Sequence, residues 1–350
     1  MIVPPPRPFR GNLRKIVILR PGALGDVLAV RGVVRFLRNV FPRLEIILAA
    51  PGEKGGLFRR PDWADAVQDW SRAAFSWLFS SEGGSPPPDL RIAFADCDWI
   101  LAYVGADPGE VFRSRLAELA PVAGALFSPA HPEPAPGEAG EPIGIWLLRP
   151  VLACCRQFFP CPPAISLDPA VLAAARFRIA ARPSLAPAVP YAVFHPGSGG
   201  AKKNWPLENY AALGKRLAGD GPICRRLVVT SGEEDGDLGE RLAAAVPGAG
   251  HVHNPTLENL AGLLAHAGIY IGNDSGVSHL AAAVEDRTGK TPDTLVIFGP
   301  SDARIWAPPG AKILSAGREM RNLPPEIVWR EILSFGGRVR VEGGRSRQSS

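Results

Sequence analysis

Short, strongly apolar stretches recur along this chain, and each ends in a polar or glycine-rich turn that leads into a helical pattern. Residues 15–20, 191–195 and 269–271 are examples. Such runs predict strands buried on both faces, as in a parallel sheet whose crossovers are helices. A proline-rich stretch, 182–190, separates two series of this kind, and 350 residues are enough for two domains. We therefore predict two α/β domains.

The segment 269–284 shows this pattern most clearly. A strand pattern ends at Gly272, the three residues after it are of types that cap helices, and a helix of small residues follows. The amides and the positive dipole end of such a helix favour an anion. His279 would lie on the same helical face as Ser275, one turn further on. The segment therefore predicts an anion site.

The first apolar run is followed by the turn PGALGD, a helical pattern over 27–41 and a strand pattern over 44–50. The glycines of the turn do not have the GxGxxG spacing, so the dinucleotide-binding fingerprint is absent here. Asp26 ends the turn, and two interpretations of it stay open. Its carboxylate could cap the helix, or it could take a proton from a substrate hydroxyl above the carboxyl edge of a parallel sheet.

A second glycine-rich loop, 196–200, follows a predicted strand. Glycines let backbone N–H groups approach an oxyanion, and Lys202 and Lys203 add positive charge beside them. The residue order is not that of a P-loop, but the loop is a candidate phosphate site. Further along, Glu234 follows another strand pattern. It could hold a ribose diol, or it could be an acidic residue in the first turn of a helix.

The region 51–190 carries no motif that can be assigned to a chemistry. We expect strands over 91–97 and 99–104 and a mobile loop over 129–142, which is rich in Pro, Gly and Glu. The tail 336–350 is rich in Gly, Arg and Ser, a composition typical of disorder.

The net charge of +5 is unevenly distributed. Residues 1–60 carry 12 Lys/Arg and 3 Asp/Glu, a net charge of +9, so the other 290 residues sum to −4. A basic segment favours a polyanionic partner (a phosphorylated lipid, an anionic sugar or nucleic acid) or serves solubility. Five cysteines without a CxxC pair indicate a reduced, cytoplasmic protein. We expect neither a membrane span nor a signal peptide.

Four blocks of the sequence together resemble glycosyltransferase family 9, the ADP-heptose:lipopolysaccharide heptosyltransferases. They have the family's order and spacing and span most of the chain outside 51–190. The resemblance implies a GT-B architecture, in which two Rossmann-like, doubly wound domains face a central cleft. The blocks are KIVILRPGALGDVLAVRGVVRFLRNVFP (15–42), HPGSGGAKKNWPLENYAAL (195–213), IYIGNDSGVSHLAAAV (269–284) and VIFGPSDARIWAP (296–308).

The resemblance also implies which ligand each domain would bind. An N-terminal domain, 1–182, would bind the acceptor, and a C-terminal domain, 183–335, would bind a nucleotide-sugar donor. The last helix, 325–335, could return to pack on the N-terminal domain. The reaction would move a hexose or a heptose-like sugar from a donor of the ADP-heptose type to a lipopolysaccharide core or another cell-envelope glycan. It would invert the anomeric centre, without a covalent intermediate.

The residue roles follow from that chemistry. Asp26 is the candidate general base, which removes the proton of the acceptor hydroxyl. A lysine and a helix dipole can stabilise the leaving diphosphate in place of a divalent metal, so we expect neither a metal nor a cofactor. The candidate donor-binding residues are Ser198, Gly199, Lys203, Glu234, Asp274, Ser275, Gly276 and His279. The candidate contacts for acceptor phosphates or carboxylates are Arg59, Arg60, Arg113 and Arg115.

The expected partners are a nucleotide-diphosphate sugar and an anionic glycolipid or glycan, with no nucleic acid. The basic first 60 residues also favour peripheral contact with the inner face of the cytoplasmic membrane. Two other classes stay open. One is a nucleotide-sugar epimerase or a dinucleotide oxidoreductase on the same architecture; the missing fingerprint argues against the oxidoreductase. The other is a non-catalytic sugar-nucleotide or glycan-binding protein, against which Asp26, Lys203 and Asp274 argue.

Overall fold

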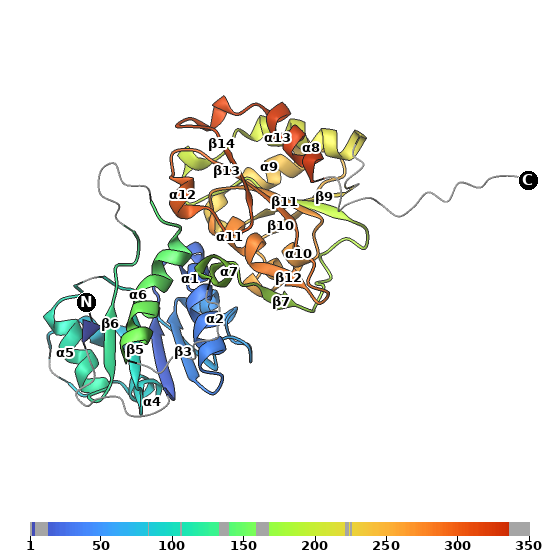
Figure 1. Ribbon diagram of the computed structural model, residues 1–350. Coiled ribbons are helices and arrows are strands. Elements are labelled where there is room, and N and C mark those ends of the chain that lie inside the picture. The colour runs from blue at the N-terminus through green and yellow to red at the C-terminus, as the bar shows by residue number, and fades with distance from the viewer. Residues whose placement is uncertain are drawn as a thin grey trace, which may run out of the picture. The chain divides into compact units, whose positions relative to one another are not determined.

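The chain forms two compact units, Met1–Arg176 and Phe177–Ser350, each with its own core. Each unit contains a six-stranded sheet with helices on both faces (Figure 1). The prediction of two α/β units is therefore confirmed. The computed structural model describes the backbone of residues 2–3 and residues 13–82, 84–105, 107–132, 140–158, 168–220, 224 and 226–335.

The sheet of the first unit has the strand order β1-β6-β5-β2-β3-β4. Its neighbouring strands are parallel except for the edge pair β1 and β6, which is antiparallel. The strand β2 is the first predicted apolar run, and its last four residues are buried. The strands are β1 (Ile2–Val3), β2 (Lys15–Leu19), β3 (Glu45–Ala50), β4 (Ala66–Asp69), β5 (Trp99–Ala102) and β6 (Gly124–Phe127).

Helices cover both faces of this sheet because successive strand residues point to opposite sides. Val17 packs in a cluster with Phe94, so η1, α4 and α5 cover that face. On the other face Ile16, Leu37 and Val151 line one small cavity, which brings α2 and α6 together. The helices are α1 (Leu24–Ala29), α2 (Arg31–Val40), α3 (Gly52–Gly56), η1 (Ala73–Phe79), α4 (Pro88–Phe94), α5 (Glu110–Leu119), α6 (Ile143–Phe158) and α7 (Pro169–Ala173).

Two predictions for the first unit are wrong. Residues 91–97, predicted as a strand, begin inside α4, which starts at Pro88 and buries Phe94 against the sheet. Proline is favourable in the first turn of a helix, and a short apolar run does not distinguish a buried strand from a buried helical turn. The single helix predicted over 27–41 is two helices, α1 and α2, which meet at Val30.

The sheet of the second unit has the order β10-β9-β8-β11-β13-β14, and all of its pairs are parallel. The order reverses between β8 and β11, and ligands of open α/β sheets bind at the carboxyl ends of such strands. The strands are β8 (Tyr191–His195), β9 (Arg226–Ser231), β10 (Gly250–His253), β11 (Ile269–Asn273), β13 (Asp293–Phe298) and β14 (Lys312–Ser315), with a small separate sheet of β7 (Phe177–Ile179) and β12 (Val284–Asp286).

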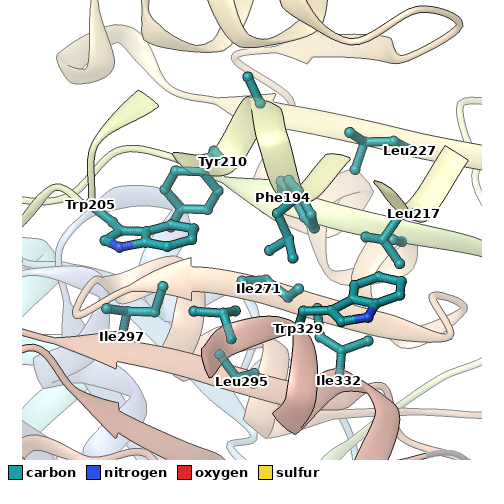
Figure 2. Packing of buried hydrophobic residues seen from close by; sticks show 14 of the residues in the cluster. Phe194, Trp205, Tyr210, Leu217, Leu227, Ile271, Leu295, Ile297, Trp329 and Ile332 are labelled. Carbon is teal, nitrogen blue, oxygen red and sulfur yellow. The ribbon is translucent and has the colours of Figure 1, made fainter. Parts of the chain in front are cut away.

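The core of the second unit lies between this sheet and the helices α8, α9 and α13. Figure 2 shows Trp329 of α13 beside Leu217 of α8, while the rings of Trp205 and Tyr210 lie with centroids 4.9 Å apart. Helices α10 and α11 cover the opposite face. The helices are η2 (Ala201–Lys203), α8 (Leu207–Asp220), η3 (Glu233–Asp235), α9 (Leu238–Ala245), α10 (Leu257–Ala265), α11 (Gly276–Ala283), α12 (Ala303–Trp306), η4 (Met320–Asn322) and α13 (Pro325–Ser334).

Several predictions concern segments outside these sheets. The tail 336–350 and residues 133–139 of the predicted mobile loop lie outside the described residues. Helix α13 packs in the core of the second unit, and its contact with the N-terminal domain stays a prediction. None of the helices that the structure describes is long and apolar enough to cross a membrane.

We predict that Ile332→Ala lowers the free energy of unfolding by about 2–5 kcal/mol, because it leaves a cavity in a packed core. Ile332 is fully buried, whereas its neighbour Leu333 is 44% exposed. Leu333→Ala is therefore the matched control, with a change within about 0.5 kcal/mol. Urea denaturation of both variants measures the difference. Equal effects would contradict the packing of α13 described here.

Candidate functional site

Asn273, the last residue of β11, joins the two loops at the carboxyl edge of the second sheet. Its side chain is fully buried. Its Nδ2 donates to the carbonyl of Pro196 at 2.7 Å and lies 3.4 Å from that of Gly197. Its Oδ1 accepts from the Trp205 amide and the Tyr210 hydroxyl, both at 3.1 Å. One amide therefore fixes the loop after β8 to the end of β11, in surroundings where each of these polar groups needs a partner.

Next to it, Lys203 of η2 forms an ion pair with Asp274. The distance from Nζ to Oδ2 is 2.7 Å, and the side chains are 37% and 8% exposed, respectively. A lysine ammonium has three N–H donors, so Lys203 can hold Asp274 and still offer donors to a ligand. The buried carboxylate positions a cation whose other side is open to solvent.

Helix α11 begins directly after this pair. Its N-cap is Ser275, whose Oγ accepts from the Ser278 amide at 3.3 Å. The amide of Gly276 lies in the first turn, where N–H groups have no partner within the helix. His279 lies one turn further on and is buried, with its amide bonded to the Ser275 carbonyl at 3.3 Å. This helix end and Lys203 together provide positive charge suited to an anion.

The remaining candidate donor residues lie on neighbouring loops. Ser198 Oγ lies 2.9 Å from the Gly200 carbonyl and 2.6 Å from Asn204 Oδ1, so this hydroxyl holds its own loop together. Gly199 is exposed on the same loop, and Glu234 is exposed on η3 after β9. All eight predicted donor residues thus follow the carboxyl ends of β8, β9 or β11: Ser198, Gly199, Lys203, Glu234, Asp274, Ser275, Gly276 and His279.

Beneath Gly197 lies a buried pair that the sequence did not single out, His195 and Asp235. A β-carbon added to Gly197 would lie 1.7 Å from Asp235 Oδ1, so a side chain there would displace this carboxylate. Asp235 Oδ2 accepts from the Gly232 amide at 2.7 Å and lies 3.8 Å from His195 Nε2. Burial lowers the pKa of His195 below its ordinary 6.5, while the charge of Asp235 and a bond to the Thr230 carbonyl act the other way.

A pocket of about 790 Å³ adjoins the same sheet edge on the side of β13 and β14. Its lining includes Asn204, Lys202 and Arg318, and its size is that of small-molecule sites. Within the described part of the chain, no group of three or more His, Cys, Asp or Glu side chains is arranged to hold a metal ion.

In the first unit, the turn after β2 places Asp26 in the first turn of α1. Its Oδ2 accepts from the Ala23 amide at 2.9 Å, which is the capping role that the sequence left open. Gly22 has a φ of 130°, and a β-carbon added there would lie 2.7 Å from Asp26 Oδ2. Glycine therefore serves both the conformation of the turn and access to this oxygen.

Two side chains that the sequence did not single out hold the other oxygen of Asp26. Arg20 is fully buried, and its Nη2 lies 3.3 Å from Asp26 Oδ1. His131 Nε2 lies 2.9 Å from the same oxygen. Burial lowers the pKa of Arg20, and the charge of Asp26 partly offsets that effect. The Asp26 carboxylate is thus fixed by donors on both of its oxygens.

The four arginines predicted to contact an acceptor lie in two places. Arg59 is exposed and Arg60 partly buried, just after α3, whose Lys54 Nζ reaches the Gly22 carbonyl at 3.3 Å. The other two lie on α5 and already have partners. These are Asp107 for Arg113, and Ser80, Glu82 and Glu118 for Arg115. Acceptor contact by any of the four stays a prediction.

Some of the missed residues had a signal in the sequence. Arg20 is a charged residue directly at the end of a buried strand, a position where a side chain must find a partner. Asn273 is the last residue of the buried strand β11, but from the sequence it was interpreted only as a helix cap. His131 had no local signal, because its position beside Asp26 depends on the strand order of the sheet.

We predict that Asn273→Ala lowers the free energy of unfolding by roughly 2–5 kcal/mol, because several buried polar groups would lose their partner at about 1–3 kcal/mol each. Asn259 is exposed on α10, so Asn259→Ala serves as the control, with a change within about 0.5 kcal/mol. Chemical denaturation checks both variants. A loss below 1 kcal/mol for Asn273→Ala would contradict the role of its amide.

Comparison with known proteins places this geometry in context. Residues 164–325 match the model of glycosyltransferase family 9 (heptosyltransferase). Lipopolysaccharide heptosyltransferase 1 of Pseudomonas aeruginosa is 31% identical over 116 residues, which is 33% of this chain. The match spans 30% of the length of that relative.

Three solved structures share the fold over nearly the whole chain. ADP-heptose LPS heptosyltransferase II of E. coli has a TM-score of 0.67 at 18% identity, covering 92% of this chain and 98% of that one. E. coli heptosyltransferase WaaC with ADP has a TM-score of 0.63 at 18% identity, covering 91% of this chain and 99% of that one. The family 9 glycosyl transferase of Veillonella parvula has a TM-score of 0.68 at 15% identity, covering 94% of this chain and 99% of that one. The predicted GT-B fold of two Rossmann-like units is therefore confirmed. Within this chain, residues 164–325 are similar to glycosyltransferase family 9, the heptosyltransferase family.

Proposed function

We propose that this protein is an inverting glycosyltransferase. It moves a heptose-like sugar from a nucleotide-diphosphate donor, of the ADP-heptose type, to a lipopolysaccharide core or another cell-envelope glycan. The observation that carries the proposal is the Lys203–Asp274 pair at the N-terminus of α11, inside the segment that matches the family. A related protein, E. coli WaaC, has been solved with ADP and with ADP-2-deoxy-2-fluoro heptose.

In the proposed reaction, the acceptor hydroxyl attacks the anomeric carbon of the donor sugar as the bond to the diphosphate breaks. Asp26 takes the hydroxyl proton, and the diphosphate leaves with the electron pair of the broken bond. This mechanism requires Asp26 of the first unit to reach the sugar held by the second. Inversion follows because the attack occurs opposite to the leaving group.

The leaving diphosphate gains negative charge, and the second unit supplies fixed positive groups for it. The Gly276 amide, the α11 dipole and Lys203 stabilise this charge without rearranging during the reaction. Ser198, Gly199, Ser275 and His279 contact the phosphates, Asp274 holds the sugar hydroxyls or orients the turn, and Glu234 holds the ribose. Because the cations come from the protein itself, we propose that the transfer needs no metal.

The acceptor is an anionic glycolipid or glycan that binds the first unit. Arg59 and Arg60 are favoured as contacts because Lys54 joins their segment to the turn that carries Asp26. Arg113 and Arg115 would have to exchange existing partners for the acceptor. We further propose a cytoplasmic protein that contacts the inner face of the membrane through its basic first 60 residues.

We predict that Lys203→Ala weakens binding of a nucleoside diphosphate by roughly 10- to 100-fold, because a charge-assisted contact contributes about 1.5–3 kcal/mol. Lys215→Ala removes the same charge from an exposed position on α8 and should change the affinity less than threefold. Titration calorimetry with ADP measures both, and thermal melts confirm that both variants fold. Equal affinities in the two variants would exclude this loop as the diphosphate site.

We predict that Asp26→Asn lowers kcat on the order of 10²–10⁴-fold with little change in donor affinity, because the amide cannot accept the proton. Asp89→Asn, at an exposed ion pair with Arg72, is the control and should retain full activity. The assay follows transfer and slow hydrolysis over a panel of nucleotide sugars.

The same panel separates the proposed function from its alternatives. Transfer or hydrolysis that depends on Asp26 supports the glycosyltransferase. Epimerisation of the free nucleotide sugar would indicate an epimerase, and tight binding without turnover would indicate a binding protein. Normal turnover by Asp26→Asn would remove this residue from the proposed mechanism.

A further inference from the structure

The two oxygens of the Asp26 carboxylate have different surroundings. Oδ1 lies 2.9 Å from His131 Nε2 and 3.3 Å from Arg20 Nη2. Oδ2 accepts one bond, from the Ala23 amide, and faces the bare α-carbon of Gly22. Each carboxylate oxygen can accept about two hydrogen bonds. Oδ1 is therefore saturated by protein groups, whereas Oδ2 can accept one more bond from a substrate.

The position of His131 beside Asp26 is built into the fold. Arg20 Nε donates to the Asp26 backbone carbonyl at 2.8 Å, and its Nη1 donates to the Ala130 carbonyl at 2.9 Å. One fully buried guanidinium thus joins α1 to the segment after β6, just before the histidine. Burying a charged group costs free energy unless its donors find partners. The contacts of Arg20, called the Arg20 clamp below, therefore hold α1 and the segment before His131 in a defined arrangement.

The exposure of the two side chains suggests a function rather than a packing role for His131. Its side chain is 49% exposed, whereas that of Asp26 is 16% exposed. A half-exposed imidazole contributes little to a core. Two cations lie near the pair in the described part of the chain: Arg20 at the end of β2, and Lys54 of α3, which reaches the Gly22 carbonyl.

We propose that His131 is a positioning residue for Asp26, an inference that rests on the proposed function. Its Nε2–H donates to Oδ1 and holds the carboxylate so that Oδ2 points at the acceptor hydroxyl. The O–H bond of the acceptor breaks, its proton goes to Oδ2, the new bond to the anomeric carbon forms, and the diphosphate leaves. His131 takes no proton from the substrate; it fixes the plane of the carboxylate that does.

The test compares His131→Ala, His131→Gln and wild type in the transfer assay. The alanine variant removes the donor to Oδ1 and should lower kcat by roughly 10- to 100-fold with an unchanged donor KM. The glutamine variant keeps an N–H donor and should therefore recover most of kcat. His266→Gln, at the end of α10, is the matched control and should leave kcat and donor KM unchanged.

The outcomes separate this inference from the proposed function. If wild type transfers sugar and Asp26→Asn does not, but both His131 variants match wild type in kcat and donor KM, the positioning role is wrong and the base assignment stands. If His131→Gln is as slow as His131→Ala, an N–H donor to Oδ1 is not what matters and the inference fails. If wild type transfers no sugar at all, the proposed function itself fails, as the Asp26 series would show independently.

Discussion

The second unit depends on one buried amide at the end of a central strand. Asn273 bonds both ends of the loop after β8 and the first turn of α8, so the loop and β11 form one rigid edge. The residues next to it, Asp274 and Ser275, then orient Lys203 and begin α11. A lysine and helix amides bind an anion most strongly when they are already fixed in place before the ligand arrives. Binding then costs no free energy for rearranging these groups.

The first unit uses the opposite chemistry at the equivalent place. There the strand ends in a buried cation, Arg20, which holds a carboxylate in place. Both units thus put a polar side chain at the carboxyl end of a central strand and use it to tie down the next loop. A parallel sheet permits this arrangement because the carboxyl ends of neighbouring strands lie at the same edge. One edge then presents a carboxylate and the other presents positive charge.

The sequence predicted most of the second unit because its strands are apolar runs with sharp turns. The element β8 was placed residue for residue, and α11 ended one residue before its predicted end. The first unit was harder. Residues 91–97 had the apolar content of a strand but pack as the helix α4. Tertiary packing, which cannot be inferred from the local sequence pattern, decides between a strand and a helix here.

Candidate site residues were predictable where the pattern that indicates them lies within one short segment. Lys203, Asp274 and Gly276 follow from a glycine-rich loop and a helix start. His131 could not be found in this way, since it reaches Asp26 across a separation of 105 residues. Only the strand order β6-β5-β2, together with the Arg20 clamp, brings these two side chains together.

The central claim is that the second unit binds a nucleoside diphosphate at the carboxyl edge between β8 and β11. A crystal structure of the protein with ADP tests it most directly. The account predicts phosphate oxygens within hydrogen-bond distance of the Gly276 amide and of Lys203 Nζ, with Asn273 still holding the loop. A diphosphate bound elsewhere on the chain, with the Lys203–Asp274 pair untouched, would contradict it.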